Sequence, residues 1–432
     1  MTRPLIDVQS PVERAFLVGA PRKGTDELLH VDEHLDELER LAETAGAEVI
    51  GRAIQRIESP TSNFYLGQGK VEELKDTLAE ARATLLMFDE TLSPLQGSKL
   101  EKHLGVRVMD RTEVILDIFA TRARSHEAKI QVELAQLEYL LPRLTRMWTH
   151  LSRIRGGIGL RGPGETQLET DRRAIRRKIG QHKKRLKAVA DHRANQRQGR
   201  GDRHVPSAAL IGYTNAGKSS LLQALSGQDV FVEDRLFATL DTLTREVDVG
   251  EGYRFRVTDT VGFIRKLPHH LVASFRATLE EANDADLMLH VIDASHPEWE
   301  EQVEVVERET RSVTPKRVIH VFNKADLLPD RDAFLALVRE NYPHAVLTST
   351  VSGTGIDALR GALRTSSQAL RPIAQIRVPV GDGKLLAALH RDAEVLEQVQ
   401  TNGIVTVTAR IEARLLGKLR HDGVEVVLGG DS

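Results

Sequence analysis

Several features are missing from this sequence of 432 residues, and each absence narrows the class of protein. Cysteine is absent, which excludes disulfides, thiol catalysis and zinc–thiolate sites. No apolar run approaches the roughly 18–20 residues that cross a bilayer, so we expect no membrane span. Residues 1–14 lack the apolar core of a secretion signal. We therefore expect a cytoplasmic protein.

Composition and charge indicate a globular chain with one unusual segment. Hydrophobic residues make up 41% and charged residues 28%, which argues against wholesale disorder, and the length suggests about three domains. The net charge is −2, but residues 142–203 hold 18 Lys and Arg against five Asp and Glu. A basic block in an otherwise acidic chain is typical of a surface that binds a polyanion.

Residues 1–112 alternate apolar runs with helical patterns, which predicts an α/β domain with parallel strand pairing. At one helix start, Ser93, Pro94 and Gln96 predict a capping box with proline at the first helical position. The predicted strands are 15–19, 48–57, 84–88 and 106–109, and the predicted helices are 27–45, 71–81 and 94–104.

Residues 113–200 change to the pattern of long helices. Apolar residues from Ile130 to Leu151 follow a heptad spacing, and a weaker seam runs from Leu168 to Val189. A glycine-rich stretch over 152–164 lies between the two seams. We therefore predict a long antiparallel helical hairpin with a basic, glycine-rich tip.

The remaining boundaries follow from breaking signals and from changes of period. Pro142 lies inside the first seam, where proline costs about 3 kcal/mol and where we expect a kink or a break. The polar stretch 191–206 has no apolar period and predicts a linker, which we place at 201–206. Residues 207–368 return to βα alternation, and residues 369–432 predict a small α+β domain. The strands predicted in the larger of these two parts are 208–211, 254–258, 287–292, 318–322 and 345–347.

A phosphate-binding loop is predicted where the first of these strands ends. The sequence there fits G-x-x-x-x-G-K-[ST] between an apolar strand and a helical run. Backbone N–H groups of such a loop wrap a β-phosphate, Lys218 reaches the β- and γ-oxygens, and Ser219 offers a hydroxyl to Mg²⁺. The loop consists of Gly212, Tyr213, Thr214, Asn215, Ala216, Gly217, Lys218 and Ser219.

Two later segments predict that the base is guanine. Asp326 can accept hydrogen bonds from guanine N1–H and the 2-amino group, whereas adenine would leave its carboxylate unpaired. It ends the N-K-x-D sequence Asn323, Lys324, Ala325 and Asp326, which follows an apolar strand. After the next strand, a backbone N–H would reach guanine O6 from Ser349, Thr350 and Val351.

The γ-phosphate and the metal need two more elements. Asp259 would hold Mg²⁺ through water, and the Gly262 N–H would contact the γ-phosphate. These two residues frame the D-x-x-G sequence Asp259, Thr260, Val261 and Gly262. A switch hydroxyl must also reach Mg²⁺, and both Thr239 and Thr242 suit that role. Together with the phosphate loop, this order of elements predicts an Mg²⁺-dependent GTPase.

Two residues modify the expected mechanism. Phe263 follows D-x-x-G, where Ras-like switches carry a glutamine that orients water. A phenyl ring has no such group, so we expect slow intrinsic hydrolysis and activation by a partner. Asn215 lies inside the phosphate loop, where potassium-activated GTPases place an asparagine that ligates the ion. Potassium stimulation is therefore a hypothesis, and a simple turn-forming role for Asn215 is its alternative.

These elements and the helical insert resemble the HflX family of translational GTPases within the Obg/HflX-like P-loop GTPases. The most specific run is residues 156–173, and residues 89–96, 106–124 and 131–144 also match the family's pattern. The resemblance implies that the switch is Phe237, Ala238, Thr239, Leu240 and Asp241, and it assigns Mg²⁺ ligation to Thr239 alongside Ser219. The expected catalytic residues are Lys218, Thr239, Asp259 and Gly262. One departure is Ser349, Thr350 and Val351, where Ser-Ala-Lys is usual.

The resemblance also implies partners. Family members bind the large (50S) ribosomal subunit and 70S ribosomes, and some split ribosomes under stress. The basic hairpin fits ribosomal RNA, and we expect a monomer that cycles between GTP and GDP. An RNA-modification-associated GTPase and a regulatory module with a protein effector are the alternatives. Residues 67–70 resemble a phosphate-loop fragment, although a turn that begins a helix fits them better.

Overall fold

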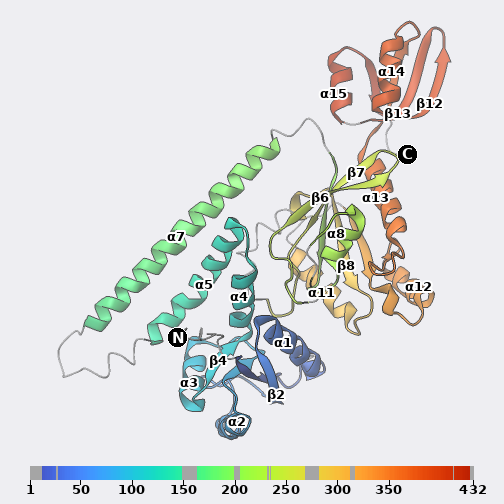
Figure 1. Ribbon diagram of the computed structural model, residues 1–432. Coiled ribbons are helices and arrows are strands. Elements are labelled where there is room, and N and C mark those ends of the chain that lie inside the picture. Colours follow the sequence, from blue (N-terminus) through green and yellow to red (C-terminus); the bar gives the residue numbers. More distant parts are fainter. Residues whose placement is uncertain are drawn as a thin grey trace, which may run out of the picture. The chain divides into compact units, whose positions relative to one another are not determined.

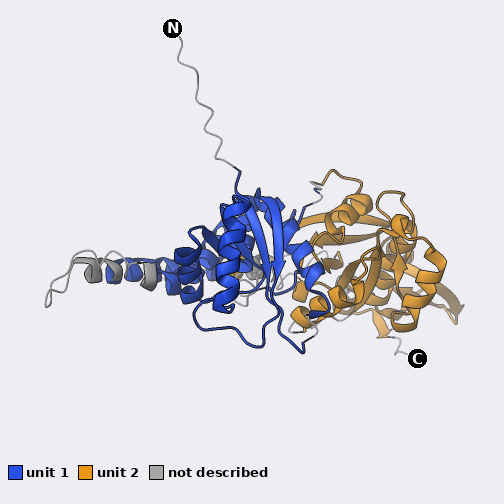
Figure 2. Cartoon of the chain, turned by 90° about the horizontal axis from the view of Figure 1, so that it is seen from below, with its two compact units in different colours: residues 1–189, 233–241, 264–277 blue, residues 190–232, 242–263, 278–432 orange. Residues whose placement is uncertain are grey.

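The computed structural model describes residues 12–25, 28–147, 163–198, 205–230, 233, 235–267, 282–311, 317–411 and 413–428. The chain divides into two compact units, each assembled from separated segments (Figure 2). Unit 1 comprises residues 1–189, 233–241 and 264–277, and unit 2 comprises residues 190–232, 242–263 and 278–432. Apart from their last residues, the predicted glycine-rich tip and linker lie outside the described residues.

Unit 1 contains a four-stranded parallel sheet in the order β2-β1-β3-β4 (Figure 1). This confirms the predicted parallel α/β layer. Helices α2 and α3 bury Leu74 and Leu100 against Phe16 and Phe88 of the sheet. Its elements are β1 (Arg14–Gly19), α1 (Val31–Ala45), β2 (Glu48–Ile54), α2 (Gln68–Glu80), β3 (Leu85–Phe88), α3 (Pro94–Leu104) and β4 (Arg107–Asp110).

Helix starts in this sheet domain follow the predicted chemistry. At α3, the Ser93 hydroxyl accepts from the Gln96 N–H and the Gln96 side chain accepts from the Ser93 N–H, which confirms the capping box. Gly67 is the N-cap of α2, so the 67–70 fragment is a turn that begins a helix.

Helices α4 (Arg111–Arg122) and α5 (His126–Met147) and the part of α7 (Pro163–Gln198) up to residue 189 complete unit 1. Helices α5 and α7 run in opposite directions along each other (Figure 1), and ion pairs from Lys178 to Glu133 and from Lys183 to Glu138 join them. The polar residues 191–198 continue α7 as helix, which corrects their assignment to the linker. Sequence analysis missed this extension because these polar residues have no apolar period.

Helix α5 continues through Pro142. The expected break is therefore wrong. Leu134, Ala135 and Tyr139 of this helix are buried against unit 1, and this burial offsets the hydrogen bond that proline removes.

Unit 2 contains a six-stranded sheet in the order β10-β9-β8-β5-β7-β6. All pairs are parallel except β6 with β7. Helices α8 and α13 pack on one face, and α11 and α12 pack on the other. The elements are β5 (Ser207–Gly212), α8 (Lys218–Ser226), β6 (Leu243–Gly250), β7 (Tyr253–Asp259), β8 (Leu287–Asp293), α11 (Trp299–Thr310), β9 (Val318–Asn323), a 3₁₀ turn (Ala325–Leu327), α12 (Arg331–Asn341), β10 (Val346–Leu347) and α13 (Ile356–Leu370).

The C-terminal part of unit 2 is a small antiparallel sheet in the order β12-β13-β11-β14. Two helices bury Leu389 and Leu419 against it, which confirms the predicted α+β class. The elements are β11 (Ile373–Pro379), α14 (Gly383–Asp392), β12 (Glu394–Thr401), β13 (Ile404–Arg410), α15 (Ala413–His421) and β14 (Glu425–Leu428).

Candidate nucleotide site

The phosphate loop lies between the end of β5 and the start of α8. Asn215 and Gly217 adopt left-handed backbone conformations, with φ of 61° and 92°. A Cβ on Gly217 would lie 2.2 Å from the Asn323 side-chain nitrogen, so only glycine fits there. Such a curled loop aims successive N–H groups at one point, where a phosphate can bind.

Lys218 places its ammonium at this loop. Its Nζ is buried and donates to the carbonyl oxygens of Gly212 at 3.2 Å and Tyr213 at 2.7 Å. Burial lowers the pKa of Lys218 to about 8, against the opposing effect of Asp259. Lys218 therefore stays mainly protonated at neutral pH and can pair with phosphate oxygens.

Ser219 and Asp259 bring two oxygen groups together. The Ser219 hydroxyl donates to Asp259 Oδ2 at 2.6 Å, and Asp259 is fully buried at the end of β7. Hydroxyl and carboxylate oxygens are the protein ligands that Mg²⁺ prefers. The residues present therefore fit a magnesium ion.

Backbone pairing holds D-x-x-G against the phosphate loop. The Phe263 N–H donates to the Gly212 oxygen at 3.0 Å, and the Thr214 N–H donates to the Phe263 oxygen at 2.7 Å. A Cβ on Gly262 would lie 2.8 Å from Thr214 Cα and 2.9 Å from Lys218 Nζ. The Phe263 side chain is buried, and a phenyl ring has no polar group that could orient a water molecule.

Asn323 connects the guanine-specific segment to the phosphate loop. Its side-chain nitrogen donates to the Ala216 oxygen at 3.1 Å, and its side-chain oxygen accepts from the Thr348 hydroxyl at 3.2 Å. We did not predict this link from the sequence. The N-K-x-D pattern was the available signal, since its first residue is an amide that can donate and accept at once.

Asp326 lies beside Ser349, whose hydroxyl donates to Asp326 Oδ1 at 2.5 Å. The Ser349 N–H is already bonded to the Thr354 oxygen at 2.9 Å. An N–H for guanine O6 would therefore come from Thr350 or Val351, which form the following turn. Val351 is 85% exposed. Valine in place of the usual lysine therefore changes a surface position and not the packing of the site.

The predicted switch, 237–241, belongs to unit 1, whereas the segments above belong to unit 2. Asp241 accepts from the N–H groups of Arg124 at 2.9 Å and Ser125 at 3.0 Å, and from the Ser125 hydroxyl. The Phe237 ring meets the edge of Phe119 with centroids 4.6 Å apart. The structure thus places both ends of this segment against α4 and the start of α5. Ala238 and Thr239 are half-buried and Leu240 is buried.

Residues 264–277, which follow Phe263, also belong to unit 1. Lys266 Nζ pairs with Asp89 at 2.5 Å and with Glu90 at 2.6 Å. Asp89 is 2% exposed and also pairs with Arg111 at 2.7 Å. Burial would raise the pKa of Asp89, but Arg111 and Lys266 outweigh it and hold that pKa below its ordinary value. Sequence analysis missed this network because its members are far apart in the chain.

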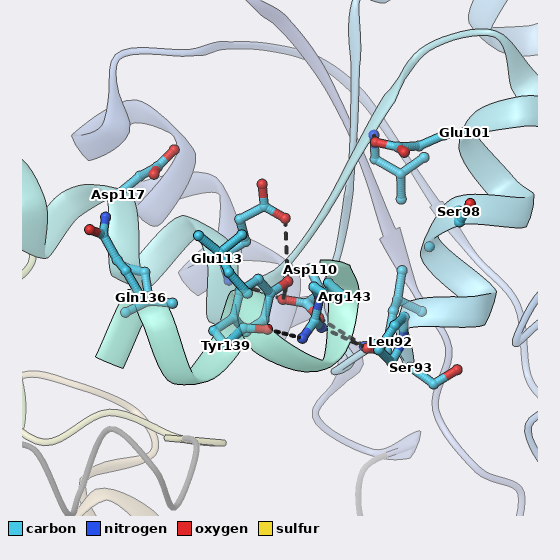
Figure 3. A pocket seen from close by; sticks show the side chains of 15 residues that line it. Leu92, Ser93, Ser98, Glu101, Asp110, Glu113, Asp117, Gln136, Tyr139 and Arg143 are labelled. Carbon is cyan, nitrogen blue, oxygen red and sulfur yellow. Dashed lines mark hydrogen bonds and ion pairs between the residues drawn. The ribbon is translucent and has the colours of Figure 1, made fainter. Parts of the chain in front are cut away.

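Unit 1 also has a pocket of about 420 Å³ beside α3, α4 and α5 (Figure 3). At its base, the buried Asp110 accepts from the Leu92 and Glu113 N–H groups, the Tyr139 hydroxyl and Arg143. Burial raises the pKa of Asp110 against the opposing effect of Arg143. The bonds from Tyr139 and Arg143 to Asp110 join α5 to the end of β4, so the polar groups at the base of this pocket are already paired.

Comparisons with known proteins agree with this geometry. Residues 32–120 match a family described as GTP-binding GTPase N-terminal, and residues 122–200 match a GTP-binding GTPase middle region. Residues 207–324 match a family described as 50S ribosome-binding GTPase. Together with the fold and the site, these matches define a P-loop GTPase, an enzyme that binds GTP and hydrolyses it to GDP and phosphate.

The relatives identify the family. GTPase HflX of Magnetococcus marinus is 42% identical, covering 98% of this chain and 99% of that protein. GTPase HflX of Escherichia coli is 43% identical, covering 88% and 90% respectively. The chain belongs to the HflX family, as its sequence predicted. A GTP-binding protein of Sulfolobus solfataricus, solved with GDP, is 24% identical with a TM-score of 0.45, covering 83% of this chain and 100% of that one. No described helix is long and apolar enough to span a membrane.

Proposed function

We propose that this GTPase associates with the large ribosomal subunit and the 70S ribosome, and that it splits or rescues ribosomes under stress. The observation that carries the proposal is the charge on α7. Five of its cations form no ion pair with any residue that the structure describes, and all five are exposed: Arg176, Arg177, Lys184, Arg185 and Lys187.

Ribosomal RNA suits this surface. Exposed cations that no acid neutralises can displace the counterions of phosphates, which gives binding that weakens steeply with salt. Of the three aromatic residues in 113–200, Phe119 and Tyr139 are buried and Trp148 is the third, so base stacking contributes little. The description of the family that residues 207–324 match, 50S ribosome-binding GTPase, supports the same partner.

Within the nucleotide site, we propose that Lys218 pairs with the β- and γ-phosphates and that Asp326 recognises guanine. Ser219 and the switch residue Thr239 would ligate Mg²⁺, with Asp259 holding it through water and the Gly262 N–H contacting the γ-phosphate. The magnesium ion would neutralise charge on the phosphates during hydrolysis. Asn215 would ligate potassium, so hydrolysis should be faster in KCl than in NaCl; equal rates would leave Asn215 as a turn residue only.

Sucrose-gradient sedimentation tests the ribosome proposal. The full chain should sediment with 50S and 70S particles in the presence of a non-hydrolysable GTP analogue, and less with GDP. Deleting residues 152–164 should abolish co-sedimentation while GTP binding persists. If the deletion variant still sediments with ribosomes, the predicted basic tip is not the contact, and binding would be carried by the five cations of α7 or by a protein effector.

A further inference from the structure

Two histidines lie side by side on the face of the six-stranded sheet that α11 and α12 cover. His290 of β8 and His320 of β9 are partners in the parallel register. Residues paired in this way project from the same face of a sheet. That face is covered by α11, which supplies Glu307. Ligand atoms of His290, His320 and Glu307 all lie within 4.8 Å of one another.

Both imidazoles are prepared to act as ligands. His290 is only 2% exposed, and His320 is half-buried. Burial lowers the pKa of His290 to about 3 and that of His320 to about 4. Both rings are therefore neutral at pH 7 and keep a lone pair for a metal.

The spacing of the rings also suits a shared ion. Two imidazoles bound to one tetrahedral ion at the usual zinc–nitrogen distance have centroids about 5 Å apart. The His290 and His320 centroids are 5.5 Å apart. Glu307 is exposed, so an ion can reach the pair from solvent.

We propose that His290, His320 and Glu307 bind one divalent transition-metal ion, with zinc the best match to two nitrogens and a carboxylate. Three protein ligands leave a position for water. Mg²⁺ is a poor match because it prefers oxygen ligands, so the site is chemically distinct from the Ser219 and Asp259 pair. A bound ion would cross-link β8, β9 and α11 next to Asn323, where β9 ends.

The alternative is that the histidines only fill space. His320 packs on the Tyr342 ring with centroids 4.3 Å apart, and this contact needs no metal. A packing role predicts that the folded protein takes up no zinc at these residues.

Calorimetric titration of the full, GDP- and Mg²⁺-loaded chain with zinc chloride decides between them. We expect one zinc ion per chain, weakening by about tenfold or more in Glu307→Gln because one of three protein ligands is lost. His320→Asn should abolish uptake. Glu340→Gln and His344→Asn make the same changes at exposed positions nearby in the chain and should bind zinc as the parent does.

Cobalt substitution adds a readout that depends on the ligands themselves. The parent should give the intense visible absorption of four-coordinate cobalt, and His320→Asn should lose it. GDP affinity reports folding, and Glu307→Gln, at an exposed position, carries the test if His320→Asn fails to fold. The proposal is wrong if the parent takes up no zinc, or if Glu307→Gln binds zinc as tightly as Glu340→Gln does.

Discussion

At the scale of single residues, Asn323 and Asp326 have different roles in the nucleotide site although they are close in the chain. The Asn323 side-chain amide bonds to two loops, through the Ala216 oxygen and the Thr348 hydroxyl. The Asp326 carboxylate accepts a hydrogen bond from the Ser349 hydroxyl at the edge of the sheet. The first residue is 1% exposed and the second is half-buried. We infer that the first sets the geometry and that the second makes the chemical choice of base.

The choice of base can be reversed at one atom. Asp326→Asn replaces an acceptor with an amide donor, which suits the C2 carbonyl of xanthine rather than the 2-amino group of guanine. We expect GTP affinity to fall by about tenfold or more and XTP affinity to rise, since each unpaired group costs about 1–3 kcal/mol. Competitive binding of the two nucleotides measures both. Unchanged GTP affinity would mean that Asp326 does not recognise the base.

Residues of the motifs could be predicted from the sequence because their chemistry is local. The phosphate loop needs glycine at position 217 because the Asn323 side chain leaves no room for a Cβ there. The N-K-x-D segment needs a carboxylate for guanine. Both motifs can therefore be recognised from the sequence alone. Asp241 and Lys266 could not be interpreted in this way. Their partners, Ser125 and Asp89, are more than 100 residues away in the sequence, and no local pattern marks them.

At the scale of elements, unit 1 holds the switch segment and the segment that follows D-x-x-G and Phe263. Lys266 joins the second of these segments to the turn after β3, where Asp89 and Glu90 lie. These carboxylates outweigh the effect of burial and raise the pKa of Lys266 above its ordinary value. Element prediction succeeded where burial gave a clear period, as in the core strands. It missed β6, because the alternation of Leu243–Gly250 begins in an exposed, threonine-rich stretch.

Removing the Lys266 ammonium should destabilise unit 1. Lys266→Met leaves the buried Asp89 with one partner fewer, and breaking such a pair costs about 3 kcal/mol. Hydrogen exchange in β3 should accelerate accordingly. The matched control is Lys23→Met, whose partner Glu58 is 82% exposed and whose loss should cost less than about 1 kcal/mol. Equal effects of the two changes would contradict a buried network.

Acid should weaken the same region through His34. Burial, and then the neighbouring Lys266, lower the pKa of His34 to about 4 from an ordinary value of 6.5. Between these pH values the unfolded chain binds a proton that the folded chain does not, so stability falls as pH falls. We expect His34→Asn to flatten the urea-midpoint profile from pH 6.5 to 4. His421→Asn, at an exposed position, should leave it unchanged.

At the scale of the whole molecule, an HflX relative matches nearly the full chain, so the relative shares the GTPase core and also the parts before and after it. The described site offers Lys218 and Mg²⁺-compatible oxygens, but Phe263 stands where a water-orienting side chain would be expected. We infer that binding is built into the chain and that rapid hydrolysis requires a group or an ordering supplied by a partner. The charge on α7 suits an RNA-rich partner, and our proposal is that this partner is the large ribosomal subunit.

Single-turnover GTP hydrolysis by the full chain, with and without purified 50S subunits at fixed salt, tests this account most directly. Alone, the chain should hydrolyse GTP at roughly 10⁻⁴–10⁻² s⁻¹, the range of unassisted switches. Saturating 50S subunits should raise the rate by about tenfold or more, and added salt should remove the stimulation. A rate that is fast without subunits, or that 50S subunits leave unchanged, would contradict it.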